Sequence, residues 1–343
     1  MKTVYSDAHR GHAGAKEMHL GKLVPIHEMP SRIDMILARL AESDHRELVA
    51  PKSFSFEALT RLHSVDYVTF LSEAWDLWSA NSDAPYALPY TSVAPGMRLK
   101  VPETIDGKLS RYAFDLAAPF VAGTWDAIKA SAEVALTGQE MVAGGEGAVF
   151  SLCRPPGHHA MADQSGGYCY LNNAAIAAQA FLDGGAGRVA LVDVDYHHGN
   201  GSQSLFYDRD DVLFVSLHAD PAQEYPHFLG YGDETGEGPG EGFNLNLPMA
   251  WGTAWDGYGA ALDQGLARIA DFGPDVVVIS LGVDTFKEDP ISRFKLEHED
   301  YLRIGEAIAG LKRPTHFVME GGYAVEAIGI NTVNLLDGFA GSS

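Results

Sequence analysis

Short apolar runs rich in Val, Ile and Leu alternate along this chain with longer segments whose apolar residues recur three and four positions apart. The short runs predict buried parallel strands, and the longer segments predict helices that cover them. Strands are expected at Lys2–Tyr5, Ala148–Cys153, Arg188–Asp195, Val212–His218, Asp275–Leu281 and His316–Glu320. Helices are expected at Ser31–Ala41, Val65–Trp78, Thr124–Leu136, Asn172–Leu182, Tyr258–Ala270 and Asp300–Leu311. This alternation favours one α/β domain over residues 1–343, with helices on both faces of a mainly parallel sheet.

The stretch from Ser82 to Asp115 interrupts the pattern. It is rich in Pro, Ser and Thr and has little periodicity, so we expect a long insertion or loop. In a compact domain such a loop is usually functional or serves assembly.

Composition narrows the classes of function. With 46 acidic and 24 basic residues the net charge is −22, and the absence of a basic stripe argues against a nucleic-acid partner. An acidic field would attract cationic ligands, although acidity can also serve solubility alone. The sequence begins without an apolar run fit for a signal peptide and has no stretch of about 20 apolar residues. We therefore expect a cytoplasmic protein without a membrane partner.

The strongest chemical motif is LVDVDYHHGNG, residues 191–201. Alternate residues of a strand share a face, so Asp195 and His197 can point at one metal ion, with Asp193 on the same side beneath them. Cys153 and Cys169 lie near other polar motifs. Buried packing explains them better than a thiol nucleophile, because their neighbours in sequence suit a metal site.

Three further predicted strands end in polar residues. One leads to Asp284, one to His158 and His159 after a Pro-Pro-Gly turn, and one to Glu320-Gly-Gly-Tyr323. The carboxyl edge of an open α/β sheet is where ligands bind. Two aspartates and a neutral imidazole would balance a divalent cation and suit Zn²⁺, while Fe²⁺, Mn²⁺ and Co²⁺ also accept such ligands. Such an ion lowers the pKa of water to about 7 and polarises a carbonyl, as amide hydrolysis requires.

The two histidines should divide the proton chemistry. One would act as general base and then general acid, and the other would stabilise charge. Asp193 and Asn200 are the candidates to accept a hydrogen bond from each ring and set its tautomer. Tyr323 is the candidate donor to the oxyanion of a tetrahedral intermediate.

These motifs resemble the deacetylase branch of the arginase–deacetylase superfamily, and most closely its acetylpolyamine amidohydrolases. The segments that carry the resemblance are Tyr5–Met18, Arg154–Ala160, Gly167–Ala174, Val192–Gly201, Ala222–Gly236, Leu281–Thr285, Asp289–Leu296 and Glu320–Tyr323. The resemblance implies an arginase–deacetylase fold with about eight strands. It also implies a zinc site of Asp195, His197 and Asp284, with His159 as general base and acid, His158 as electrostatic partner and Tyr323 on the oxyanion.

The resemblance extends to groups outside the zinc site. It implies a structural K⁺ bound through five residues, which are Asp193, Asp195, His197, Ser216 and Leu217. Tyr168 and Tyr225 would line an aromatic tunnel, and Glu17 and Asp106 would lie near the far amine of the substrate. The insertion at residues 82–115 would shape a homodimer and narrow the active-site mouth.

Three positions depart from related patterns. Asn200 stands where histone deacetylases usually carry aspartate, which fits the polyamine branch. Ala117 replaces a carboxylate of some polyamine enzymes, which favours short acetylated diamines. Gly282 stands where an arginase needs a second-metal ligand, which argues against that branch. We therefore expect hydrolysis of N-acetylated polyamines or diamines, such as acetylputrescine or acetylcadaverine. An acetyl-lysine deacetylase of proteins or peptides and a non-catalytic acetylamine-binding module are the alternatives.

Overall fold

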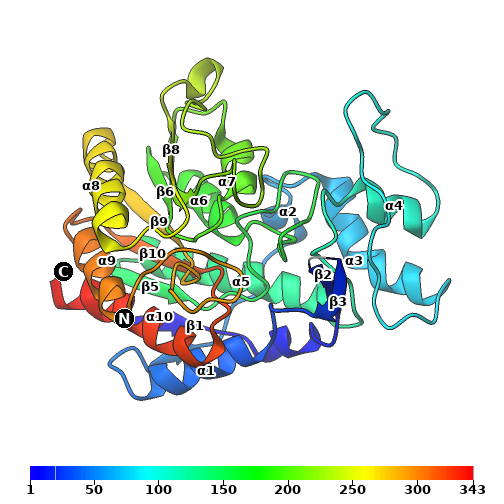
Figure 1. Cartoon of the computed structure of the whole chain (residues 1–343), viewed down its shortest axis with the longest axis horizontal. Coiled ribbons are helices and arrows are strands. Elements are labelled where there is room, and N and C mark those ends of the chain that lie inside the picture. The colour runs from blue at the N-terminus through cyan, green and yellow to red at the C-terminus, as the bar shows by residue number, and fades with distance from the viewer. Residues whose placement is uncertain (20, 343) are drawn as a thin grey trace.

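An eight-stranded parallel sheet forms the centre of the protein in the computed structural model, which describes residues 1–19 and 21–342. Its strand order is β4-β1-β5-β10-β9-β6-β7-β8 (Figure 1). The strands are β1 (Lys2–Val4), β4 (Leu48–Val49), β5 (Ala148–Ser151), β6 (Val189–Asp193), β7 (Val212–Ala219), β8 (Asn244–Met249), β9 (Val276–Leu281) and β10 (Thr315–Met319). A separate antiparallel hairpin consists of β2 (Lys16–His19) and β3 (Lys22–Pro25). The predicted α/β fold with about eight strands is confirmed.

All six strands predicted from apolar runs are present, but two strands of the sheet were missed. β4 has two residues, too few to show a pattern. β8 lies at the sheet edge, where it pairs with β7 alone. Its sequence NLNLPM includes Asn244, Asn246 and Pro248, and such residues are depleted in central strands and tolerated at edges.

Helices cover both faces of the sheet. They are α1 (Ser31–Ala41), α2 (Phe56–Leu59), α3 (Val65–Ser79), α4 (Ile105–Arg111), α5 (Thr124–Ala143), α6 (Asn173–Asp183), α7 (Asn200–Phe206), α8 (Trp255–Phe272), α9 (His298–Ala309) and α10 (Val325–Ser342). Helices α1, α8, α9 and α10 share one core cluster with the sheet, and α5 and α6 share another. The period of two is visible in β6, where Ala190 and Val192 face the first cluster and Val189 and Leu191 face the second.

The segment 82–115 has more structure than the sequence predicted. It contains the helix α4, whose N-cap residue Thr104 accepts a hydrogen bond from the Gly107 N–H. Ile105 and Leu109 of α4 pack into a third apolar cluster together with α3. This cluster lies at the end of the molecule away from α8 and α9 (Figure 1). A single apolar pair four residues apart is too short a pattern to predict a helix.

Candidate active site

The carboxyl ends of four central strands bring the polar motifs together. Asp193 is the last residue of β6 and is in register with Ser280 of β9. Asp284 follows β9, Glu320 follows β10, and the turn that carries the paired histidines follows β5. Because these strands are parallel neighbours, their ends meet at one edge of the sheet.

Asp195, His197 and Asp284 form a buried cluster of ligand atoms, all within 4.8 Å of one another. Nδ1 of His197 lies 2.9 Å from Oδ2 of Asp284 and 3.5 Å from Oδ1 of Asp195. Ligand atoms that share a tetrahedral zinc ion at about 2.1 Å stand roughly 3.4 Å apart. The spacing of these three side chains therefore fits one divalent cation.

Backbone groups hold the two carboxylates in place. The N–H of Tyr196 donates to Oδ1 of Asp284 at 2.8 Å, and the N–H of Gly321 donates to Oδ2 of Asp195 at 2.8 Å. A Cβ atom at Gly282 would lie 2.0 Å from Oδ2 of Asp195, so no side chain fits there. The Asp195 side chain thus occupies the space that a second-metal ligand at this position would need.

The site concentrates negative charge away from water. Burial and the neighbouring Asp195 raise the pKa of Asp284 to about 7, and burial also raises the pKa of Asp193. Buried carboxylates that repel one another are stabilised by a nearby cation. This charge balance, like the spacing of the ligand atoms, fits a divalent ion bound to the aspartates.

The paired histidines have different partners. Nδ1 of His158 lies 2.9 Å from Oδ2 of Asp193, whereas Nδ1 of His159 lies 2.6 Å from Oδ1 of Asn200. Burial opposes the charged form of both rings, but Asp193 and Asp195 outweigh it at His158 and raise its pKa to about 10. The pKa of His159 is lowered by burial and by the charge of His158. The two rings therefore differ in their hydrogen-bond partners and in the direction in which their pKa values are shifted.

A pocket of about 390 Å³ opens onto this cluster. It is lined by His159, His197 and Tyr323 and by three of the four predicted substrate-binding residues, Glu17, Tyr168 and Tyr225. Burial raises the pKa of Tyr323 far above its usual value, so its phenol stays protonated. Tyr168 has a left-handed φ of 67°, which is uncommon for a bulky residue and typical of functional sites.

The predicted substrate carboxylates have different positions. Glu17 is 5% exposed, and its Oε2 accepts a hydrogen bond of 2.6 Å from the Tyr168 hydroxyl. Asp106 is exposed on α4 and is not among the residues that line the pocket. Sequence reasoning missed Asp115, whose Oδ2 accepts hydrogen bonds from the Gly167 N–H and the Tyr225 hydroxyl. Asp115 thereby positions two segments of the pocket wall.

A buried ion-pair network supports the Glu320–Tyr323 turn and was also missed. Oε1 of Glu28 accepts hydrogen bonds of 2.8 Å from Arg32 and from Arg154. Arg32 also donates to the carbonyl oxygens of Glu320 and Gly322, both at 2.6 Å. One signal was available, since Arg32 lies on the same helix face as Ile36 and Leu40 and is buried with them.

Asp289 fixes the other side of this turn. Its Oδ2 accepts hydrogen bonds from the backbone N–H groups of Tyr323, at 2.7 Å, and of Ala324. The guanidinium of Arg32 lies 4.9 Å from the centre of the Tyr323 ring. The phenol is therefore held from both sides.

The residues of the predicted K⁺ site are neighbours on two strands. Asp193 of β6 is in register with Ser216 of β7, and Leu217 follows it. Ser216 is fully buried, and its Oγ lies 2.8 Å from Nδ1 of His218. The K⁺ site remains a prediction.

Neither cysteine is suited to act as a nucleophile. Cys153 and Cys169 are free and buried, and burial raises the pKa of both thiols. Sγ of Cys169 lies near His158 and Glu320, but the Glu320 carboxylate already accepts hydrogen bonds from the N–H groups of Gly157 and His158. The cluster therefore resembles a structural support more than a second metal site.

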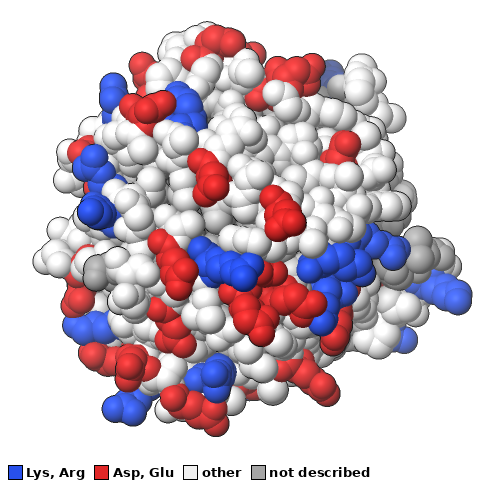
Figure 2. Space-filling model, turned by 60° about the vertical axis from the view of Figure 1, so that its left-hand side comes forward, with Lys and Arg blue, Asp and Glu red and all other residues white. Residues whose placement is uncertain are grey.

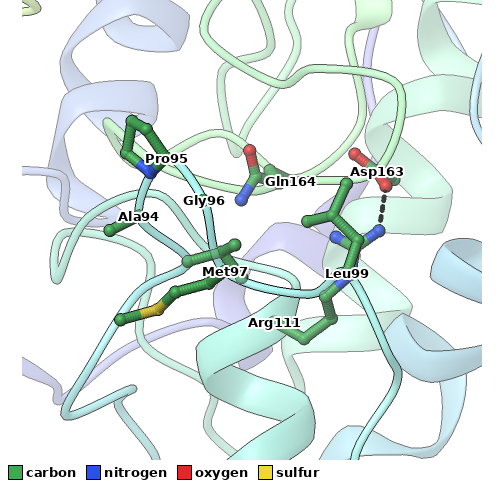
Figure 3. A pocket seen from close by; sticks show the side chains of 9 residues that line it. Ala94, Pro95, Gly96, Met97, Leu99, Arg111, Asp163 and Gln164 are labelled. Atoms are coloured by element: carbon green, nitrogen blue, oxygen red, sulfur yellow. Dashed lines mark hydrogen bonds and ion pairs between the residues drawn. The ribbon is translucent and has the colours of Figure 1, made fainter.

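A second cavity lies under the 93–99 segment and shares no lining residue with the pocket just described. Figure 3 shows this segment near the ion pair of Arg111 and Asp163, whose atoms Nη2 and Oδ2 are 2.5 Å apart. The ion pair satisfies both charges, and Met97 and Leu99 make the rest of the lining largely apolar. This cavity offers no group for catalysis.

The charge on the surface is mixed. On the face shown in Figure 2, acidic and basic side chains lie beside one another with wide uncharged areas between them. On this face the distribution is typical of a solvated surface. Within residues 1–19 and 21–342, no helix has the length and apolarity needed to cross a bilayer.

Comparisons with known proteins show the family to which the chain belongs. Residues 26–338 match the histone deacetylase domain family. The chain is 57% identical to acetylpolyamine amidohydrolase 1 of Pseudomonas aeruginosa over the whole of both chains. It is 45% identical to acetylpolyamine amidohydrolase of Mycoplana ramosa over 99% of this chain and all of the relative. A crystal structure of acetylpolyamine aminohydrolase from Burkholderia pseudomallei superposes with a TM-score of 0.95 at 35% identity, covering 100% of this chain and 99% of that one.

A parallel α/β sheet with this edge site defines an amidohydrolase of the deacetylase type, and the chain belongs to the histone deacetylase domain family. Within that family it is an enzyme of the acetylpolyamine amidohydrolase group, to whose members it is similar over its full length.

Proposed function

We propose that this protein hydrolyses the amide bond of N-acetylated polyamines and diamines in a reaction that depends on one divalent metal ion, with Zn²⁺ favoured. The observation that carries the proposal is the convergence of three ligand side chains, two differently paired histidines and a protonated phenol on one pocket. Asp195, His197 and Asp284 would hold the ion. When bound, it lowers the pKa of water and polarises the substrate carbonyl.

The two paired histidines have different roles in the proposed reaction. His159 is neutral and lines the pocket, so its free Nε2 can accept a proton from the attacking water and return it to the leaving amine. Asn200 orients this ring through Nδ1. His158 stays charged beside Asp193 and stabilises the negative charge that develops.

Tyr323 donates a hydrogen bond to the carbonyl oxygen as that atom becomes an oxyanion. Asp289 and Arg32 hold the phenol in position before the reaction begins, so no reorganisation is needed when charge appears. Asp193, Ser216 and Leu217 would contribute to a structural K⁺ site beneath.

The pocket walls favour a slender cationic substrate. Tyr168 and Tyr225 offer aromatic surface to an alkyl chain, and the buried carboxylate of Glu17 offers a counter-charge to the far ammonium. Relatives named acetylpolyamine amidohydrolase support this substrate class. Exposed apolar side chains in the 82–115 segment, namely Tyr90, Met97 and Leu99, support a homodimer that would cover the mouth.

The test is acetate release from acetylputrescine, acetylcadaverine and an acetyl-lysine peptide, with metal-free protein and with protein loaded with Zn²⁺, Fe²⁺, Co²⁺ or Mn²⁺. We expect loaded protein to release acetate faster from the diamines than from the peptide. Faster peptide turnover would favour a protein deacetylase, and binding without acetate release would favour an acetylamine-binding module.

A further inference from the structure

One wall at the pocket mouth has no part in the proposed acetyl chemistry. It is formed by Trp251 and Arg293, which line the same pocket as His159 and Tyr323. The carbon at the centre of the Arg293 guanidinium lies 5.6 Å from the Trp251 ring centre, within the range of a cation–π contact. The Arg293 guanidinium therefore brings a positive charge to this wall.

Backbone hydrogen bonds fix this arrangement. The N–H of Gly252 donates to the carbonyl oxygen of Arg293 at 2.9 Å, and the N–H of Lys295 donates to that of Thr253 at 2.8 Å. These two hydrogen bonds join the loop that carries Trp251 to the loop that carries Arg293.

The indole is anchored from the other side. Nε1 of Trp251 donates to Oε2 of Glu224 at 3.1 Å, and the hydroxyl of Tyr196 donates to the same oxygen at 2.7 Å. The other oxygen, Oε1, accepts from the Tyr225 N–H at 3.2 Å. Three neutral donors occupy most of the lone pairs of Glu224 and leave its negative charge in place, so Glu224 positions the indole beside Arg293.

The charge of Arg293 is not neutralised by a direct partner. In the part of the chain that the structure describes, residues 1–19 and 21–342, no carboxylate forms an ion pair with it. This is notable in a chain of net charge −22. The pocket thus combines a buried carboxylate, Glu17, with an exposed guanidinium at the mouth.

We propose that Arg293 is a specificity-determining residue that selects acetylated amines with a single ammonium group over those with further ammonium groups. The inference rests on the proposed function and adds an electrostatic limit on the number of ammonium groups that a good substrate carries. The first ammonium of a bound substrate would pair with the buried Glu17, and a longer polyamine would bring its next ammonium toward the exposed Arg293 in the same pocket. For an assumed separation of about 8 Å at a partly solvated mouth, the repulsion between two like charges would lower kcat/KM by roughly fivefold.

The experiment compares kcat/KM for N-acetylputrescine, which has one ammonium, with N1-acetylspermine, which has three, across Arg293→Lys, Arg293→Gln and Arg293→Glu. The measured quantity is kcat/KM for the polyamine divided by kcat/KM for the diamine. This ratio should stay near the wild-type value in Arg293→Lys, rise about fivefold in Arg293→Gln and rise further in Arg293→Glu. Raising the salt concentration should shrink these differences, because the mouth is exposed to solvent.

The matched control is Arg313→Gln, which removes the same charge from an exposed arginine just before β10. This residue lies at the amino ends of the strands, whereas the site lies at their carboxyl ends. Arg313→Gln should leave the ratio unchanged. A ratio that does not follow the charge at position 293, or that shifts equally in Arg293→Lys and Arg293→Gln, would overturn the inference. Failure of the wild-type protein to release acetate from either amine would instead refute the proposed function.

Discussion

Replacing Tyr323 with phenylalanine removes one oxygen from the site and should leave the ring in place. The ring packs edge-on against Tyr168, with centroids 5.6 Å apart, and lies beneath the Arg32 guanidinium. Its backbone N–H donates to Asp289 whichever side chain is present. The substitution therefore tests the hydroxyl alone.

The expected loss of activity follows from the proposed role of the hydroxyl as a hydrogen-bond donor to the oxyanion. Removing one oxyanion donor lowers kcat by about 10²–10³-fold, or roughly 2.7–4 kcal/mol of transition-state stabilisation. KM should change little, because the donor interacts most strongly with the transition state. Burial keeps the wild-type phenol protonated, so the ratio of wild-type to variant kcat should stay constant between pH 6 and 9.

The assay is steady-state acetate release with zinc-loaded protein, with urea unfolding as a check that the variant folds. Tyr168→Phe is the matched control, since it removes a hydroxyl from the facing ring and loses the hydrogen bond to Glu17. That change should raise KM more than it lowers kcat. Retention of kcat within about threefold in Tyr323→Phe would refute the role of the hydroxyl.

Three further changes test the metal site, the buried ion pairs and a buried histidine outside the site, His63. Asp284→Ala should lose bound zinc, and full zinc content by elemental analysis would contradict its assignment as a ligand. Glu28→Gln leaves Arg32 and Arg154 buried without their shared counter-charge, so the free energy of unfolding should fall by about 3–5 kcal/mol in urea titrations; a loss below about 1 kcal/mol would refute this reasoning. Burial lowers the pKa of His63 to about 4, so the unfolded chain, with a pKa near 6.5, binds the proton first as the pH falls. Stability should therefore decline between pH 6.5 and about 4 by roughly 3 kcal/mol from this group, and urea titrations across that range should show a smaller decline in His63→Gln.

Features that depend on local sequence were predictable. The run of apolar residues that ends in Asp193 identifies both a buried strand and the residues at its end, because strand period and sheet edge follow from neighbours in the chain. The same reasoning placed Asp284, His158 and Tyr323 at one edge. Because neighbouring parallel strands end at the same side of a sheet, the strand assignments alone predicted that these residues lie close together.

Features that depend on contacts between residues far apart in sequence were not predictable. Arg154 meets Glu28, 126 residues before it, only after folding, and nothing near Arg154 in sequence marks it as half of a buried pair. Helix α10 was missed because it packs between α1 and α9 and is apolar on more than one side, which removes the amphipathic period. Asp115 was missed because its partners, Gly167 and Tyr225, lie 52 and 110 residues away.

The smallest version of this protein that can fold and act is larger than its matched family range. Trimming the chain to residues 26–338 would remove β1 from between β4 and β5, leaving a gap inside the sheet. It would also remove the carbonyl oxygens of His9 and His12, which accept hydrogen bonds from Arg154, and the pocket carboxylate of Glu17. Any transfer of this activity to another scaffold must therefore include the first 25 residues along with the matched range.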